Sequence, residues 1–387
     1  MTQPHPGQID PDVVVLGGGM AGLSFACALA QSQGPSPLHH ALVLEPRPSY
    51  AQDKTWCYWQ QGTSPFDQAI THRWQHWTVS HAGHTHTCSS TETPYVRVDS
   101  GRFYEIAQGI INDSKAVSLR LGARADRVDA CDEDVTVTSG KDRIRTPWVI
   151  DTRPTDIPDG TLLQHFMGWE IQTDQDVFDP STVTLMDFAP AARDIHFFYV
   201  LPFSRRRALV ETTHFSMSPL KDEQYRRELG GYLQTRFGLD HWQITRTEQG
   251  VIPMPRRAPN LQLRGHKRVI PLGLHADTTK PSTGYCYPHA QDQAKRQARA
   301  LLDGNFAAPP GARSELSRWF DAVFIGFLER YPERAGSIFL RLFQQVPSDA
   351  LIRFLTDKAQ PGDYLKVMTA LPKGTFIRQA LSHAISA

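Results

Sequence analysis

The sequence has no long apolar run and no excess of charge of either sign. Lys and Arg total 41 against 40 for Asp and Glu, a net charge of +1, which argues against a basic surface for nucleic acid. No apolar stretch approaches the roughly 18 residues of a membrane-spanning helix. The segment MTQPHPGQIDPD at the N-terminus lacks the basic and apolar regions of a secretory signal. We therefore expect a cytoplasmic protein that neither binds nucleic acid nor spans a membrane.

Cysteine is also scarce, and its spacing excludes two classes of small domain. The five cysteines are an odd number without a CxxC pair: Cys27, Cys57, Cys88, Cys131 and Cys286. This pattern argues against a disulfide framework and a zinc ribbon, and it fits a reducing cytosol. His84, His86 and Cys88 would share one face of a strand, but no second ligand cluster accompanies them, so no metal site is expected.

A strand, a glycine turn, a helix and a second strand follow one another near the N-terminus. Residues 13–16 form an unbroken apolar run, as a strand buried on both faces requires. The motif Gly17-x-Gly19-x-x-Gly22 comes next and opens a stretch rich in Ala and Leu, which predicts a helix. A second apolar run then ends at Glu45. This order is typical of a dinucleotide-binding unit.

Each glycine of such a unit, and the acidic residue at the end of its second strand, has a physical role that these residues can fill. Gly17 permits the tight turn, Gly19 lets backbone approach a pyrophosphate, and Gly22 lets the helix pack on the strand. Glu45 is placed to accept the hydroxyls of an adenosine ribose, which disfavours a 2′-phosphate and indicates FAD or NAD. The unit lies at the N-terminus, an antiparallel segment interrupts it, and later strands return to its sheet. By analogy with known folds, this arrangement favours FAD.

The remaining pattern predicts an α/β protein with three parts. Segment 53–86 is rich in Trp, His and Thr and predicts antiparallel strands; segment 96–122 has a helical pattern; and an apolar strand ends at Asp151. Short strands dominate from about 160 to 255, and helices follow residue 290. We expect a Rossmann-type FAD-binding domain of the flavoprotein hydroxylase kind (11–155 with 260–300), an antiparallel-sheet substrate domain (156–259) and a helical C-terminal region (301–387).

Several further blocks occur along the chain in a characteristic order: LVLEPRPSYAQDKTWCYW, QHFMGWE, FDPSTVTLMDF, FYVLPFS, ALVETTHFS, EQGVIP and KPSTGYCYPHA. Together with the glycine motif, they resemble the bacterial lycopene cyclases of carotenoid biosynthesis from about residue 12 to about 290. The resemblance implies bound FAD and a long polyene, lycopene or a similar linear carotenoid, in an apolar tunnel. It also implies acid-catalysed closure of the ψ end group to a β ring, without net redox change but with the flavin reduced, NADPH being the usual electron donor.

The resemblance also assigns roles to particular residues. The acidic strand motif of the family matches Glu211-Thr212-Thr213, which makes Glu211 the candidate acid. The segment around Pro281, Thr283 and Gly284 resembles the turn that brings a loop to the ribityl chain and the isoalloxazine. Apart from these motifs, we expect the backbone of Val128, on the strand after Arg127, to contact adenine.

Residue patterning alone gives Glu211 a suitable environment for an acid. In a strand over 208–215, Leu209, Glu211, Thr213 and Phe215 lie on one face. A carboxyl between apolar neighbours has a raised pKa, because desolvation disfavours its charged form, and can therefore donate a proton near neutral pH. The alternative is a solvent-facing Glu in an amphipathic strand.

The sequence departs from the family at two places. Thr212, rather than a second acid, follows the candidate acid. Gly273-Leu274 stands where related flavoproteins have a Gly-Asp pair at the pyrophosphate, so backbone amides would act there, or the correspondence has slipped.

Other features leave two interpretations open. Trp56, Tyr58 and Trp59 line the tunnel or fill the core, and Arg97 faces the flavin or forms a structural salt bridge. The amphipathic helices of 316–356 cap the core or form a lip at the inner face of the cell membrane. For the activity, the alternatives are an FAD-dependent monooxygenase or halogenase, a cyclase of another linear terpenoid, and a carotenoid-binding protein without turnover.

Overall fold

A computed structural model of the chain describes residues 10–32, 38–154, 156–189, 194–256, 266–306, 313–372 and 374. A five-stranded parallel sheet has the order β18-β12-β1-β2-β8. Its strands are β1 (Val13–Leu16), β2 (Ala41–Glu45), β8 (Val117–Leu121), β12 (Trp148–Asp151) and β18 (Val269–Pro271). The predicted strand–turn–helix–strand unit is confirmed, and its second strand ends at Glu45.

Both faces of this parallel sheet are covered, which explains the unbroken apolar run of β1. Val13 and Val15 face the helices, whereas Val14 and Leu16 face a small antiparallel sheet. The helices are α1 (Met20–Ala30), α2 (Ser100–Asn112) and α4 (Tyr287–Leu302). The small sheet consists of β9 (Arg127–Ala130), β10 (Val135–Ser139) and β11 (Asp142–Thr146).

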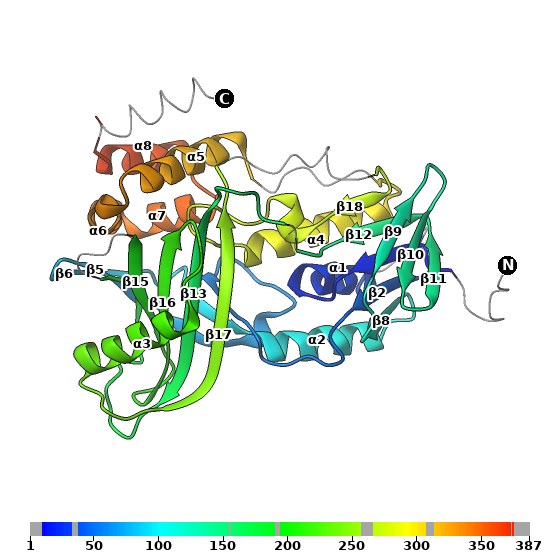
Figure 1. The fold of residues 1–387 in the computed structure, drawn as a ribbon. Coiled ribbons are helices and arrows are strands. Elements are labelled where there is room, and N and C mark those ends of the chain that lie inside the picture. The colour runs from blue at the N-terminus through cyan, green and yellow to red at the C-terminus, as the bar shows by residue number, and fades with distance from the viewer. Residues whose placement is uncertain are drawn as a thin grey trace.

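A seven-stranded sheet in the order β17-β13-β16-β15-β14-β5-β6 forms the second large unit. Its strands are β5 (His76–His81), β6 (His84–Ser89), β13 (Leu162–Gln172), β14 (Thr182–Phe188), β15 (Ile195–Pro202), β16 (Arg207–Ser216) and β17 (Gln243–Met254). Helix α3 (Asp222–Phe237) lies across one face of this sheet (Figure 1). The sheet therefore reaches beyond the predicted segment 156–259, because β5 pairs in parallel with β14.

A three-stranded sheet, in the order β3-β7-β4, links these two units. It contains β3 (Thr55–Trp59), β4 (Ile70–Trp74) and β7 (Tyr95–Asp99), and the 3-10 turn η1 (Asp67–Ala69) precedes β4. The helical pattern of 96–122 is thus only partly right. Helix α2 occupies its centre, with β7 and β8 on either side.

The C-terminal part is helical, as predicted, and packs over one end of the large sheet (Figure 1). It comprises α5 (Glu315–Arg330), η4 (Pro332–Arg334), α6 (Ala335–Gln345), α7 (Ser348–Leu355) and α8 (Pro361–Ala370). In the described residues, no helix has the length and apolar character needed to cross a membrane.

Candidate active site

A cavity of about 760 Å³ lies between the large sheet, β3, the loop before α4 and the C-terminal helices. Its walls are mainly apolar, and the aromatic lining residues include Trp56, Trp59, Tyr95, Phe166, Phe197, Tyr199, Phe215, Tyr285, Phe324 and Phe339. Carboxylates are few on these walls. The cavity therefore suits a long apolar ligand with one polar or reactive point of contact.

Glu211 lies on the wall that β16 provides, and its side chain is 8% exposed. Its same-face neighbours Leu209, Thr213 and Phe215 also line the cavity, as the alternation of a strand requires. The hydroxyl of Thr213 donates to Glu211 Oε1 at 2.7 Å. Gly168 lies opposite on β13, where an added Cβ would be 3.1 Å from Leu209 and 3.6 Å from Glu211 Cβ. This glycine leaves space beside the carboxyl group.

Burial, together with the nearby carboxylate of Glu248, raises the pKa of Glu211 to about 8. The hydrogen bond from Thr213 and the charge of Arg246 oppose this rise. Glu248 itself accepts hydrogen bonds from Thr55 Oγ1 at 2.8 Å and from Arg246 Nη1 at 2.5 Å. The two carboxyl groups therefore differ in environment, one paired with a cation and the other held in apolar surroundings. Such a difference separates an acid from a fixed negative charge.

The glycine motif has the geometry of a phosphate cradle. Gly17 has φ +98°, in the left-handed region, and a Cβ on Gly22 would come within 2.0 Å of the Gly17 carbonyl oxygen. Gly19 is the N-cap of α1 and offers no side-chain cap to the first turn. A Cβ on Gly19 would meet nothing within 4 Å, so open space borders the helix N-terminus. These residues fit the pyrophosphate of a dinucleotide.

Glu45 is buried at the end of β2 and is held in position by its neighbours. Gly18 N–H donates to Glu45 Oε2 at 2.7 Å, and Arg47 donates from its backbone and its Nε to Oε1. Burial opposes ionisation, but the hydrogen bonds from Arg47 and Gly18 outweigh it and lower the pKa of Glu45. The ionised carboxylate joins the glycine turn to β2. Sequence reasoning identified Glu45 but missed Arg47, which lies over the rings of Tyr50 and Tyr104.

The loop before α4 reaches the cavity with part of its predicted motif. Thr283 and Gly284 line the cavity, whereas Pro281 is buried and is absent from the lining. Gly284 has φ +72°, and a Cβ there would lie 2.8 Å from Gln164 Oε1. Its N–H donates to Lys280 O at 2.8 Å, which closes the turn. The loop thus presents backbone and a threonine side chain to the cavity.

Lys280, in the same loop, belongs to a buried ionic cluster that anchors this loop to the C-terminal helices. Its Nζ lies 3.0 Å from Asp321 Oδ1 and 2.8 Å from Asp357 Oδ1. Arg313 pairs with Asp321 at 2.7 Å. No motif identified this cluster from the sequence, because its members come from distant segments.

Gly273 contacts the start of α1, where the family comparison predicts a pyrophosphate contact. A Cβ on Gly273, which has φ +74°, would lie 2.7 Å from Ala21 Cβ. The correspondence of Gly273-Leu274 with the Gly-Asp pair is therefore compatible with the fold, and Leu274 is exposed at the cavity wall. Val128, by contrast, is half-buried in β9 and packs on the apolar cluster beneath the parallel sheet.

The aromatic residues near Trp56 divide between the cavity wall and the core, and Arg97 forms salt bridges. Trp56 and Trp59 line the cavity, whereas Tyr58 is buried in the core and stacks on Tyr287. Arg97 is buried and pairs with Asp99 and Glu170 at 3.7 and 3.6 Å, the arrangement of a structural salt bridge.

Sequence reasoning missed Glu248, although the block EQGVIP begins with it. The sequence alone does not give the pairing of β17 with β13. This pairing places Glu248 beside Gly168, which in turn lies beside Glu211 on β16. Three strands distant in sequence thus bring the two carboxyl groups to one wall.

Comparison with known proteins agrees with this architecture. The chain is 25% identical to the lycopene beta-cyclase of Paracoccus sp. (strain N81106 / MBIC 01143), over 95% of this chain and 96% of that protein. It is 24% identical to the lycopene beta-cyclase of Pantoea ananas, over 96% of each. The fold is shared with p-nitrophenol 4-monooxygenase PnpA from Pseudomonas putida DLL-E4, with a TM-score of 0.62, 14% identity and coverage of 97% and 98%. The family described as lycopene cyclase protein matches residues 12–381, and the chain therefore belongs to this family.

Proposed function

We propose that this protein is an FAD-dependent lycopene beta-cyclase, an isomerase that closes the ψ end groups of lycopene to β rings, forming β-carotene through γ-carotene. The observation that carries this proposal is a carboxyl group with a pKa of about 8 on the wall of a large apolar cavity, in a member of the lycopene cyclase family. At pH 7 such a group is mostly protonated, as a proton donor to an alkene must be.

In the proposed reaction, Glu211 donates its proton to the terminal double bond of the polyene. The resulting tertiary cation is attacked by an internal double bond of the same end group, which forms the ring bond. Loss of a proton from the ring carbon then leaves a ring alkene, so one proton is gained and one is lost. Glu248, hydrogen-bonded to Arg246 and Thr55, is placed on the same wall to supply negative charge for the cation. The hydroxyl of Thr213 orients the acid.

Gly17, Gly19, Gly22 and Glu45 are the residues that we expect to hold FAD, with Thr283 and Gly284 near the ribityl chain and the isoalloxazine. We assign Pro281 to the support of that loop and the backbone of Val128 to adenine. When bound in its reduced state, the flavin supplies further negative charge near the cation, and NADPH is the proposed electron donor.

The mouth of the cavity supports a peripheral contact with the inner face of the cell membrane. Leu274, Trp319, Leu365 and Met368 are exposed large hydrophobic residues that also line the cavity. Exposed apolar patches of this kind mark contacts with membranes or partners. Because a linear carotene dissolves in lipid and not in water, we propose that this mouth takes its substrate from a bilayer.

The decisive experiment is anaerobic incubation of the FAD-containing protein with lycopene in liposomes, after reduction by dithionite. We expect a product of unchanged mass and blue-shifted absorption, formed only with reduced flavin and lost in Glu211→Gln. The exposed residue Glu92 provides the matched control, and Glu92→Gln should retain full activity.

Three results would change the assignment. A product that appears only with oxygen and has a higher mass would replace the cyclase with a monooxygenase. Binding of lycopene without any product would indicate a carotenoid-binding protein. Full turnover in Glu211→Gln would keep the cyclase and remove Glu211 from the role of acid.

A further inference from the structure

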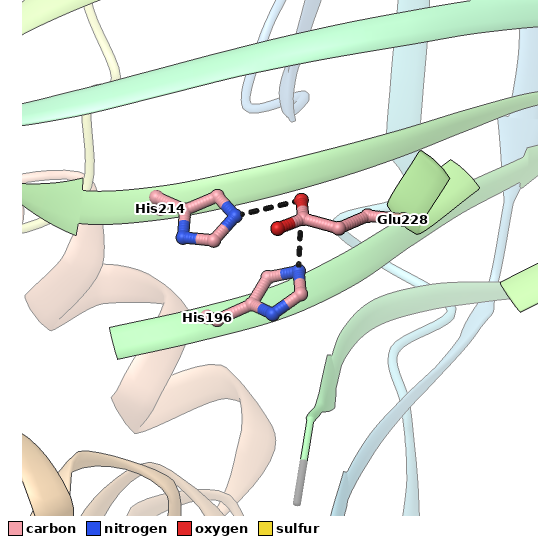
Figure 2. Close-up of side chains that lie close together, drawn as sticks. All are labelled: His196, His214 and Glu228. Atoms are coloured by element: carbon pink, nitrogen blue, oxygen red, sulfur yellow. Dashed lines mark hydrogen bonds and ion pairs between the residues drawn. The ribbon is translucent and has the colours of Figure 1, made fainter. Parts of the chain in front are cut away.

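Two histidines and a glutamate lie close together beside the large sheet (Figure 2). His196 comes from β15, His214 from β16 and Glu228 from α3. His214 follows Glu211 by three residues in the strand, so its side chain points to the opposite face. The cluster is therefore separate from the candidate active site.

Strand pairing explains why the two rings meet. His196 and His214 are direct partners across the antiparallel pair β15–β16, and their rings stack with centroids 4.0 Å apart. Each ring turns its Nε2 toward the same oxygen, Glu228 Oε2 (Figure 2), at 3.6 Å from His196 and 2.9 Å from His214. All three potential ligand atoms lie within 4.8 Å of one another.

These separations suit a shared metal ion. Two ligand atoms that are each about 2.0–2.1 Å from a tetrahedral zinc ion are about 3.3 Å apart. The separations of 2.9 and 3.6 Å lie on either side of this value. Two imidazoles and one carboxylate are also a recognised ligand set for divalent transition metals, with water in the remaining positions.

The surroundings of the cluster support binding of a cation. Among the described residues, Glu228 has no Lys or Arg within ion-pair distance, and its carboxylate is faced by the two imidazoles and the hydroxyl of Thr212. The hydroxyl of Thr212 donates to Glu228 Oε2 at 2.8 Å, where it can orient this ligand. His196 Nε2 lies 2.8 Å from the same hydroxyl and would exchange its proton for the ion. The side chains of Glu228 and His196 are 26% and 10% exposed, which leaves a path from solvent.

A third histidine close by is already engaged. His165 stacks on His214, but its Nε2 lies 2.8 Å from Ser216 Oγ and its Nδ1 lies 2.6 Å from Tyr225 OH. Both of its ring nitrogens therefore have partners, and the ligand set consists of three protein residues.

We propose that His196, His214 and Glu228 bind a divalent transition-metal ion of the zinc type. The ion would join α3 to β15 and β16 and would reinforce the strand that carries Glu211. Because the site lies on the other face of the sheet, the ion does not contact the substrate cavity. The proposal is independent of the proposed cyclase activity.

The test uses the full-length protein and Zn²⁺ alone as the probe. After incubation with Zn²⁺ and gel filtration, bound zinc is measured by inductively coupled plasma mass spectrometry. The affinity for zinc is measured by competition with a chelator. We expect about one ion per chain. His196→Ala and Glu228→Gln should weaken binding by more than about 100-fold, and Thr212→Ala, which removes the orienting hydroxyl, by about tenfold or more.

His84→Ala is the matched control, because it removes an exposed imidazole from the edge strand β6 and should leave zinc affinity unchanged. X-ray absorption of the zinc-loaded wild type should show scattering from two imidazoles, a measurement that needs no variant to fold. Three results would overturn the proposal and leave a hydrogen-bonded cluster. The wild type retains no zinc, the absorption spectrum shows no imidazole, or the zinc affinity is the same in wild type, His196→Ala and Glu228→Gln.

Discussion

Replacement of Glu211 by glutamine should make the stability of the protein less dependent on pH. In the folded protein, burial raises the pKa of this carboxyl from 4.5 to about 8. The folded state therefore keeps a proton that the unfolded chain releases, and the free energy of unfolding falls as pH rises from about 4.5 to about 8. Glutamine cannot ionise, so Glu211→Gln removes this loss while leaving a side chain of similar shape.

The expected magnitude follows from the size of the pKa change. One unit of pKa corresponds to about 1.4 kcal/mol, so the full rise corresponds to at most about 5 kcal/mol. Below pH 4.5 the contribution is absent, because both states are protonated. Between pH 5 and pH 8.5, wild type should thus lose several kcal/mol more than Glu211→Gln, an upper estimate of about 4.

Urea unfolding of the FAD-containing proteins at pH 5 and pH 8.5 would measure this difference. Glu92→Gln, which changes an exposed glutamate, should follow wild type at both pH values. Equal losses in wild type and Glu211→Gln would refute the reasoning, because Glu211 would then have a similar pKa in the folded and unfolded states.

Three further predictions concern the reaction, the cofactor and the membrane. The cyclisation rate should fall about tenfold between pH 7 and pH 9, because the protonated fraction of a group with a pKa of about 8 falls from about 0.9 to about 0.1; a rate profile that is flat over this range would argue against Glu211 as the acid. Gly19→Ala should fold normally, because its Cβ meets no protein atom, and should lose at least about tenfold in FAD affinity, because that Cβ stands in the open space proposed for the pyrophosphate. Gly22→Ala should destabilise the fold, because its Cβ would lie 2.0 Å from the Gly17 carbonyl oxygen. Titration of FAD fluorescence measures the affinity and thermal melting measures the stability; unchanged affinity in Gly19→Ala would contradict the first expectation. Leu365→Asp should weaken liposome binding in a flotation assay without loss of fold, and unchanged flotation would place the membrane contact elsewhere.

Local patterns predicted the parts of the fold that depend on neighbouring residues. A buried parallel strand needs an apolar run, and a phosphate turn needs glycines at fixed spacing, so β1, α1 and Glu45 could be placed from the sequence. The alternation of β16 likewise placed Glu211 with its three neighbours on one face, and these four residues do line one cavity.

Contacts between distant strands could not be predicted in this way. Glu248 reaches the same cavity wall as Glu211 only because β13 lies between β16 and β17. The helical pattern of 96–122 concealed β7 and β8, because both are five-residue strands next to an amphipathic helix. His196, His214 and Glu228 do not form a motif of recognised spacing, and only strand pairing and the packing of α3 bring them together.

The parallel pairing of β5 with β14 also determines how the chain can be divided. A cut at residue 155 would separate these strands and expose the edge of β14, where Val183 and Leu185 are buried in the intact protein. An exposed, apolar strand edge promotes association with other chains. The FAD-binding and substrate parts are therefore poor candidates for separate expression, and a fragment beginning at residue 156 should aggregate unless the β5–β6 hairpin is supplied with it.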